Sequence, residues 1–252
     1  MKLSVIVISK NNEAVIRRCL ESALWADELV VVDSGSADRT VEICRELGAK
    51  VKVTEDWPGH GPQKNRALDL ATGDWVLSLD SDEWMTPELR SEIERTLADP
   101  GNKAAFAMPR RSSFCGRFMR HSGWWPDYVT RLFRRDAARF SEDHTHDRVI
   151  VNGPIGRLKQ PVLHEAITDL DRMLVKMNMY STTSALEFHR SGRRASLATA
   201  LVHGGWAFMR TYFLRGGFLD GREGFMLAVA NAEGSYYRYV KLMLLSKKSG
   251  NG

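Results

Sequence analysis

The sequence predicts an α/β fold, in which helices flank a mainly parallel sheet and an amphipathic helical extension follows. Two observations support this prediction. Over the first hundred residues, short β-branched runs alternate with segments of helical periodicity, which is typical of a parallel sheet. Beyond Thr168 only helical periodicity remains. With 252 residues, 43% of them hydrophobic, the chain is long enough for one such domain and an appendage.

The strands and helices are expected in a regular order. Strands are predicted at residues 2–8, 28–33, 50–54 and 74–80, separated by helices. The first helix presents apolar residues from Val15 to Ala23, and the second ends near Leu47. A loop rich in glycine and proline precedes a helix that runs to Ala71. Thr86 followed by proline is a helix start with an N-cap.

Polar side chains follow three of these strands. Asn11, Asp33 and the pair Asp80 and Asp82 fall at carboxyl ends of parallel strands, where such sheets bind ligands. Asp80 and Asp82 are two positions apart and therefore lie on one side of the backbone. Two carboxylates with open coordination positions suit Mg²⁺ or Mn²⁺ that is also held by phosphates. The alternative is a solvated Asp-rich turn.

Two other features near this edge have two interpretations each. Lys64 and Arg66 either approach a diphosphate or are solvated charges at a helix start. His164 follows an apolar run at residues 158–163, predicted as a strand, so it either reaches the metal or diphosphate, or caps the next helix.

Aromatic and acidic residues in the second half suit a sugar acceptor. Trp124 and Trp125 offer flat faces for a pyranose, and Asp127 accepts hydrogen bonds from hydroxyls. Only one of the two tryptophans is expected to face the substrate, because tryptophans are also common in cores. The run from Asp143 to Asp147 contains two histidines, but its spacing favours a polar loop over a zinc site.

Charge and composition indicate the compartment and partners. Residues 187–252 carry ten lysines and arginines against four acids, together with many aromatics, which favours an anionic membrane surface over nucleic acid. The alternative is a helical cap on the sheet. Three scattered cysteines, no signal peptide and no run of 18 apolar residues predict a cytoplasmic protein, peripheral to the inner face of the membrane.

Three stretches together resemble the family 2 glycosyltransferases, whose GT-A fold has a mixed sheet. They are residues 3–11, residues 31–40 and residues 67–83, in the family's order and spacing. The resemblance implies a UDP-sugar donor, with Ser9, Asn11, Glu13 and Asp33 near the base and ribose. It also places Asp80 and Asp82 on the metal and diphosphate. A lengthening glycosidic bond needs such charge neutralisation, and no covalent nucleophile is required.

Residues 123–164 resemble a narrower branch, the lipopolysaccharide inner-core β-glucosyltransferases that modify a heptose. This resemblance places the general base of an inverting reaction on Asp147, where the branch usually has glutamate. Asp143 is the alternative, since the shorter side chain at 147 must reach one particular proton.

The expected function is transfer of a hexose, glucose by resemblance, from a UDP-sugar to a lipid-linked saccharide such as the inner-core heptose. A polyprenyl-phosphate or another envelope glycan is the alternative acceptor. A sugar nucleotidyltransferase lacks support because the chain does not open with a Gly-rich loop, and a non-catalytic membrane module leaves the acids without a role. Residues 1–166 are expected to form the catalytic domain, divided at residue 100 into a nucleotide-sugar half and an acceptor half. Residues 167–248 form the membrane-associating helices, and 249–252 a disordered tail.

Overall fold

A computed structural model describes residues 1–142 and 148–248, which form two compact units. The first unit comprises residues 1–110 and 127–164, and the second comprises residues 111–126 and 165–252. The expected boundary at 166 lies two residues from the observed one. The inclusion of 111–126 in the helical unit has no counterpart in the sequence-based division.

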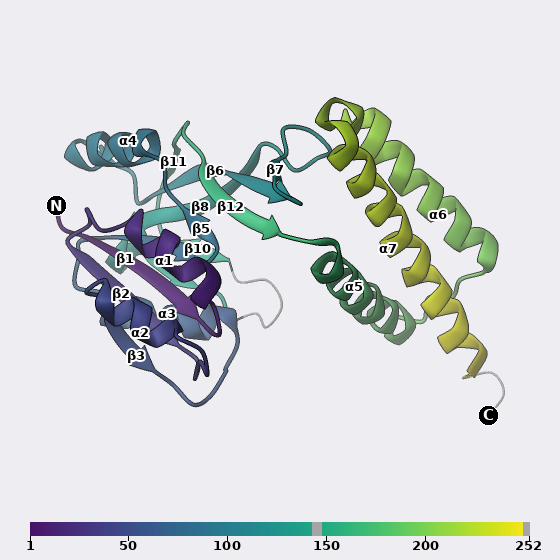
Figure 1. Cartoon of the computed structure of the whole chain (residues 1–252), viewed down its shortest axis with the longest axis horizontal. Helices are drawn as coiled ribbons and strands as arrows, with labels where there is room; N and C mark the ends of the chain where they lie inside the picture. The colour runs from purple at the N-terminus through teal and green to yellow at the C-terminus, as the bar shows by residue number, and fades with distance from the viewer. Residues whose placement is uncertain (143–147, 249–252) are drawn as a thin grey trace. The chain divides into compact units, whose positions relative to one another are not determined.

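The first unit is built on a mixed sheet. Its parallel half has the order β3 (Lys50–Val53), β2 (Glu28–Asp33), β1 (Leu3–Ser9) and β4 (Trp75–Asp80) (Figure 1). The sheet continues through β8 (Asp127–Arg134), β6 (Ala105–Phe114), β12 (Val162–Ile167) and β5 (Glu83–Trp84), with β11 (Ile155–Arg157) beside β6. Strand β8 is antiparallel to both β4 and β6. After a turn η1 (Arg135–Ala137), β9 (Ala138–Phe140) and β10 (Val149–Val151) form a separate antiparallel pair.

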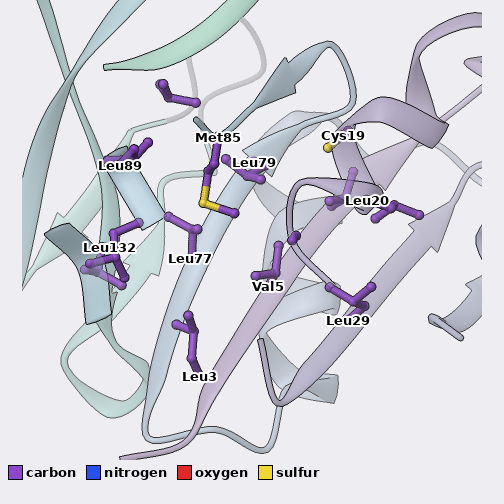
Figure 2. Packing of buried hydrophobic residues seen from close by; sticks show 14 of the residues in the cluster. Leu3, Val5, Cys19, Leu20, Leu29, Leu77, Leu79, Met85, Leu89 and Leu132 are labelled. Carbon is purple, nitrogen blue, oxygen red and sulfur yellow. The ribbon is translucent and has the colours of Figure 1, made fainter. Parts of the chain in front are cut away.

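Strands β1, β2 and β4 are buried on both faces, whereas the edge strand β3 is largely exposed. Alternate residues of a strand point to opposite faces of the sheet. On β1, Leu3, Val5 and Val7 contribute to one core cluster, while Ile6 and Ile8 contribute to another. The first cluster includes residues of α1 (Glu13–Glu21), α2 (Thr40–Glu46) and α4 (Pro87–Ala98), and Figure 2 shows its close packing. The second includes residues of α3 (His60–Leu70).

Most predicted elements are confirmed within one or two residues, and one is wrong. The Thr86 hydroxyl accepts a hydrogen bond from the N–H of Leu89 and caps α4 as expected. The strand predicted at 158–163 instead begins at Val162 and continues through His164. Residues 159–161 do not pair with a strand, because Pro161 has no N–H and the carboxylate of Glu92 accepts the N–H groups of residues 159 and 160. The N–H of Leu158 donates to the carbonyl of Ala107 on β6.

The second unit is a helical assembly. Its helices are α5 (Leu170–Arg190), α6 (Leu197–Met209) with a π-helical turn η2 (Arg210–Leu214), a short η3 (Gly217–Asp220) and α7 (Gly221–Lys248). Helix α7 packs against both α5 and α6. In Figure 1, α5 and α6 are green and α7 is yellow-green. The loop between β6 and β8, containing β7 (Arg117–Phe118), packs on these helices through Phe114 and Met119. Within the described part of the chain, no helix is long and apolar enough to cross a bilayer.

Candidate active site

The carboxyl ends of β1, β2 and β4 meet at one edge of the sheet, as the sequence predicted. The parallel register places Ser9 beside Asp33 and Ile8 beside Asp80. Because the three strands end level with one another, their terminal polar side chains and the loops that follow them form a single rim. The candidate site is built on this rim.

Asp33 organises the first part of the rim. Its carboxylate is fully buried and accepts hydrogen bonds from the hydroxyls of Ser9 (2.8 Å) and Ser36 (2.6 Å) and from the N–H of Ser36 (2.7 Å). The Ser36 hydroxyl in turn accepts the N–H of Asn11 at 2.8 Å. Asp33 therefore fixes the loop after β2 against the loop after β1, and the buried Ser9 takes part in this fixation.

Asn11 and Glu13 lie on the exposed side of the same junction. The Asn11 side chain accepts the N–H of Ala37 (2.8 Å), and the Glu13 carboxylate accepts the N–H of Arg39 (3.0 Å). Asn11 has a φ of 53°, a left-handed conformation that asparagine tolerates better than most residues. The structure brings all four predicted nucleotide-binding residues of these loops together, and nucleotide contact itself stays a prediction.

Asp80 is held between two basic side chains. Lys64 Nζ lies 2.8 Å from its Oδ1, and Arg131 binds its Oδ2. Partial burial would raise the pKa of Asp80, but the charges of Arg131 and Lys64 outweigh it and hold that pKa well below its usual range. Asp80 is therefore an ionised carboxylate at neutral pH. Lys64 is a buried charge at the rim, not a solvated one, and its contact with a diphosphate stays a prediction.

Glu83 completes this ion-pair network from the interior. Its carboxylate is fully buried, lies 2.6 Å from Arg131 Nη2 and accepts the N–H of Asp80 at 3.1 Å. Burial raises the pKa of Glu83; the charge of Arg131 opposes this shift and that of Asp80 adds to it. The opposite charges of Asp80 and Glu83 raise the pKa of Arg131, although its own burial would lower it. The network sets the position of the Asp80 carboxylate.

Asp82 forms a separate pair with His164. Its Oδ2 lies 3.5 Å from His164 Nε2, because the antiparallel pairing of β5 with β12 sets His164 opposite Glu83. His164 thus reaches the rim from within a strand, not from its end. The side chain of Asp82 is about one-third exposed, and that of His164 about one-sixth.

The side chains of Asp82 and His164 suit a divalent ion that is also bound by a substrate. Among the described residues, no group of three or more His, Cys, Asp or Glu side chains could hold an ion alone. One carboxylate and one imidazole, Asp82 and His164, offer two ligands, and Mg²⁺ or Mn²⁺ commonly takes the rest from substrate phosphates and water. Asp80 is engaged with Lys64 and Arg131, so its sharing of an ion with Asp82 stays a prediction.

The predicted acceptor residues fall in both units. In the first unit, Asp127 binds Arg110 through Nε (3.0 Å) and Nη2 (2.7 Å). In the second, Trp124 packs edge-on against the buried Phe114, with 6.0 Å between ring centroids. Trp125 has no such place in a core cluster. Which of the two tryptophans faces a substrate stays a prediction.

Asp143 and Asp147, the two candidates for the general base, lie outside the described residues, as do the two histidines between them and the tail from residue 249. The choice between the two acids stays a prediction.

Sequence reasoning missed two members of the network. Arg131 was not predicted, although an arginine beside apolar residues of a buried strand signals an interior ion pair. Glu83 was not predicted either, although it extends the acidic run of Asp80 and Asp82 by one residue. The structure shows Glu83 on a short strand with no exposed surface.

A mixed sheet that gathers acidic and basic side chains at the carboxyl ends of its parallel strands is typical of α/β proteins that bind a polar ligand at this edge. The sequence model of glycosyl transferase family 2 matches residues 4–157, more than half of the chain. The chain belongs to glycosyl transferase family 2. It is therefore a glycosyltransferase, as the resemblance implied.

Individual relatives agree with this assignment. An uncharacterized glycosyltransferase of Rickettsia typhi is 33% identical, over 99% of this chain and 89% of the relative. The lipopolysaccharide core biosynthesis glycosyltransferase LpsC of Rhizobium meliloti is 28% identical, over 96% of this chain and 92% of the relative. A structure of S. aureus TarS in complex with UDP-GlcNAc matches with a TM-score of 0.52 at 19% identity, over 99% of this chain and 92% of that one. The fold is the GT-A fold.

Proposed function

We propose that this glycosyltransferase moves a hexose, glucose in the first instance, from a UDP-sugar to a lipid-linked saccharide with inversion at the anomeric carbon. The acceptor we propose is the heptose of the lipopolysaccharide inner core. The observation that carries the donor half of the proposal is the rim itself, where Lys64 and Arg131 hold Asp80 beside the pair Asp82 and His164. The similarity to LpsC supports the acceptor class.

The chain's own residues divide the work at the donor. Asn11 and Glu13, on the exposed side of the Asp33 junction, are the proposed contacts to base and ribose. Lys64 and Arg131 supply positive charge near the leaving diphosphate, whose negative charge grows as the glycosidic bond lengthens. Asp82 and His164 would hold a Mg²⁺ or Mn²⁺ ion, which would supply Lewis-acid stabilisation of that charge.

Inversion requires a base on the face of the sugar opposite the diphosphate. We propose Asp147 for this role: its carboxylate takes the proton of the acceptor hydroxyl while the hydroxyl oxygen forms the bond to the anomeric carbon. The bonding electrons leave with UDP, so no covalent enzyme intermediate is formed. Asp127, already bound to Arg110, and Trp125 are the proposed acceptor contacts.

We further propose that the second unit docks on the anionic inner face of the cytoplasmic membrane. On α6 and η2, Val202, Trp206, Met209 and Phe213 recur at spacings of four, three and four residues, and each is about half exposed or more. Between residues 190 and 222 the chain has six arginines and one acid, Asp220, which is buried. An apolar stripe with a basic surround matches an anionic lipid surface.

Thermal unfolding with and without Mn²⁺ across a set of nucleotide-sugars tests the donor, because a ligand stabilises the fold in proportion to its affinity and concentration. We expect UDP-glucose with metal to give the largest rise in Tm. UDP release stimulated by a heptose-containing core oligosaccharide then tests the acceptor, with a polyprenyl-phosphate as the alternative. Absence of any rise with every nucleotide-sugar would overturn the proposal.

A further inference from the structure

Two arginines face each other at the end of the hairpin that β6 and β7 form in the second unit. The antiparallel register pairs Ser113 with Phe118, and the N–H of Met119 donates to the carbonyl of Ser112 at 3.1 Å, which extends the pairing. The next pair in this register is Arg111 and Arg120. Like charges at directly opposed positions destabilise a hairpin, so the arrangement has a cost.

Arg111 lies beside two aromatic rings, and its Nε lacks a hydrogen-bond partner among the described residues. Its guanidinium carbon lies 5.9 Å from the ring centroids of both Phe118 and Trp125. Its Nε is buried and makes no hydrogen bond within the described part of the chain. Burial, and secondly the charge of Arg120, lower the pKa of Arg111. A buried donor without an acceptor adds a second cost to the like-charge pair.

The acids of this unit that lie near the hairpin are engaged elsewhere. Asp220 accepts the N–H groups of Arg120 and His121 and the hydroxyl of Ser122. Glu223 pairs with Arg117 at 3.8 Å and with Arg222 at 2.6 Å. No described carboxylate pairs with either guanidinium of Arg111 and Arg120. An external anion that binds between Arg111 and Arg120 would remove both costs, the like-charge repulsion and the unpaired Nε of Arg111.

We propose that Arg111 and Arg120 form an oxyanion subsite for a phosphate or carboxylate group of the saccharide acceptor, with Trp125 stacking on the adjoining sugar ring. A guanidinium offers parallel N–H donors that match the two oxygens of such a group, and aromatic faces suit a pyranose. The proposal of an anion site depends only on the observations at this hairpin. Its assignment to the acceptor rests on the proposed function.

Thermal unfolding of the full chain in rising inorganic phosphate, at constant ionic strength set by chloride, tests the site. We expect a saturable rise in Tm for the wild type, which Arg111→Gln and Arg120→Gln abolish. Arg172→Gln on α5, an arginine with a 70% exposed side chain, is the control that keeps the rise. Arg120 is exposed, so Arg120→Gln also shows the effect should Arg111→Gln fail to fold. Equal rises in all four proteins would overturn the site.

The acceptor assignment has its own measurement. With a phosphorylated core oligosaccharide, Arg120→Gln should raise KM about tenfold with little change in kcat, and with the dephosphorylated oligosaccharide its KM should match that of the wild type. An unchanged KM for the phosphorylated acceptor would overturn the assignment. Loss of binding to phosphatidylglycerol vesicles by Arg120→Gln, with acceptor KM unchanged, would show a lipid headgroup as the anion and also overturn it. Failure of all transfer, with the phosphate effect intact, would count against the proposed function and not against the site.

Discussion

Arg131 and Glu83 form an ion pair inside the first unit, with 2.6 Å between Nη2 and Oε1 and neither side chain more than 7% exposed. The same guanidinium binds Asp80, so one interior arginine sets the position of a carboxylate at the rim. Buried pairs of this kind contribute little net stability, but loss of one member leaves an uncompensated charge. Geometry at the rim thus depends on a buried ion pair.

Glu83→Gln should lower the free energy of unfolding by about 3–5 kcal/mol, because Arg131 would keep its charge with one carboxylate fewer. Urea denaturation at neutral pH measures this. The control is Glu94→Gln, which breaks a surface pair with Arg90 in α4 (2.9 Å, both side chains about half exposed) and should cost less than about 1 kcal/mol. Equal small effects of the two substitutions would contradict the role of the network.

The metal dependence of activity should distinguish the role of Asp82 from that of Asp80. Asp82→Asn and His164→Ala should raise the Mg²⁺ or Mn²⁺ concentration for half-maximal UDP release by roughly tenfold or more, since each removes a ligand. Asp80→Asn should lower kcat with a smaller effect on the metal requirement, because Asp80 is engaged with Lys64 and Arg131. If Asp80→Asn gives the larger metal effect, the two aspartates share the ion as the sequence predicted. Full activity of Asp82→Asn would remove the metal assignment.

Strands β1, β2 and β4 could be predicted from the sequence because each is buried on both faces, so that its apolar run is continuous. In the exposed edge strand β3, valines alternate with lysines. The rim followed from where those runs end. The link from Arg131 to Asp80 could not be predicted, since it requires β8 to lie antiparallel beside β4, a contact between residues 51 positions apart. The strand that contains His164 was predicted with the wrong bounds for a local reason: residues on both sides of Pro161 were assigned to one strand.

The identity of the base can be decided by two matched substitutions. Asp147→Asn should lower kcat by about 10²–10⁴-fold, the usual contribution of a general base, with donor binding preserved. Asp143→Asn, which removes the same charge four residues away, should retain turnover within a few-fold. Steady-state UDP release with acceptor present measures both. The reverse outcome would assign the base to Asp143.

Two helical glycines of the second unit should respond in opposite directions to alanine. A Cβ at Gly224 in α7 would lie 1.9 Å from the backbone oxygen of Gly217, so Gly224→Ala should destabilise the unit by at least about 1–3 kcal/mol. Gly205 in α6 has open space around such a Cβ, and Gly205→Ala should stabilise by up to about 1 kcal/mol through helix propensity. Thermal unfolding of both variants checks the packing of η3 on α7, and similar shifts would contradict it.

Membrane docking predicts binding that depends on both charge and the apolar stripe. The wild type should sediment with phosphatidylglycerol vesicles at low salt and less at high salt, because screening weakens the arginine contribution. Replacing Trp206 and Phe213 with serine should weaken binding roughly tenfold or more, since both side chains would lose apolar burial in the interface. Trp57→Ser, at a comparably exposed tryptophan of the first unit, is the control and should bind like the wild type. If vesicle binding is absent and sedimentation shows a dimer that the double substitution dissociates, the stripe is a contact between two copies of the chain.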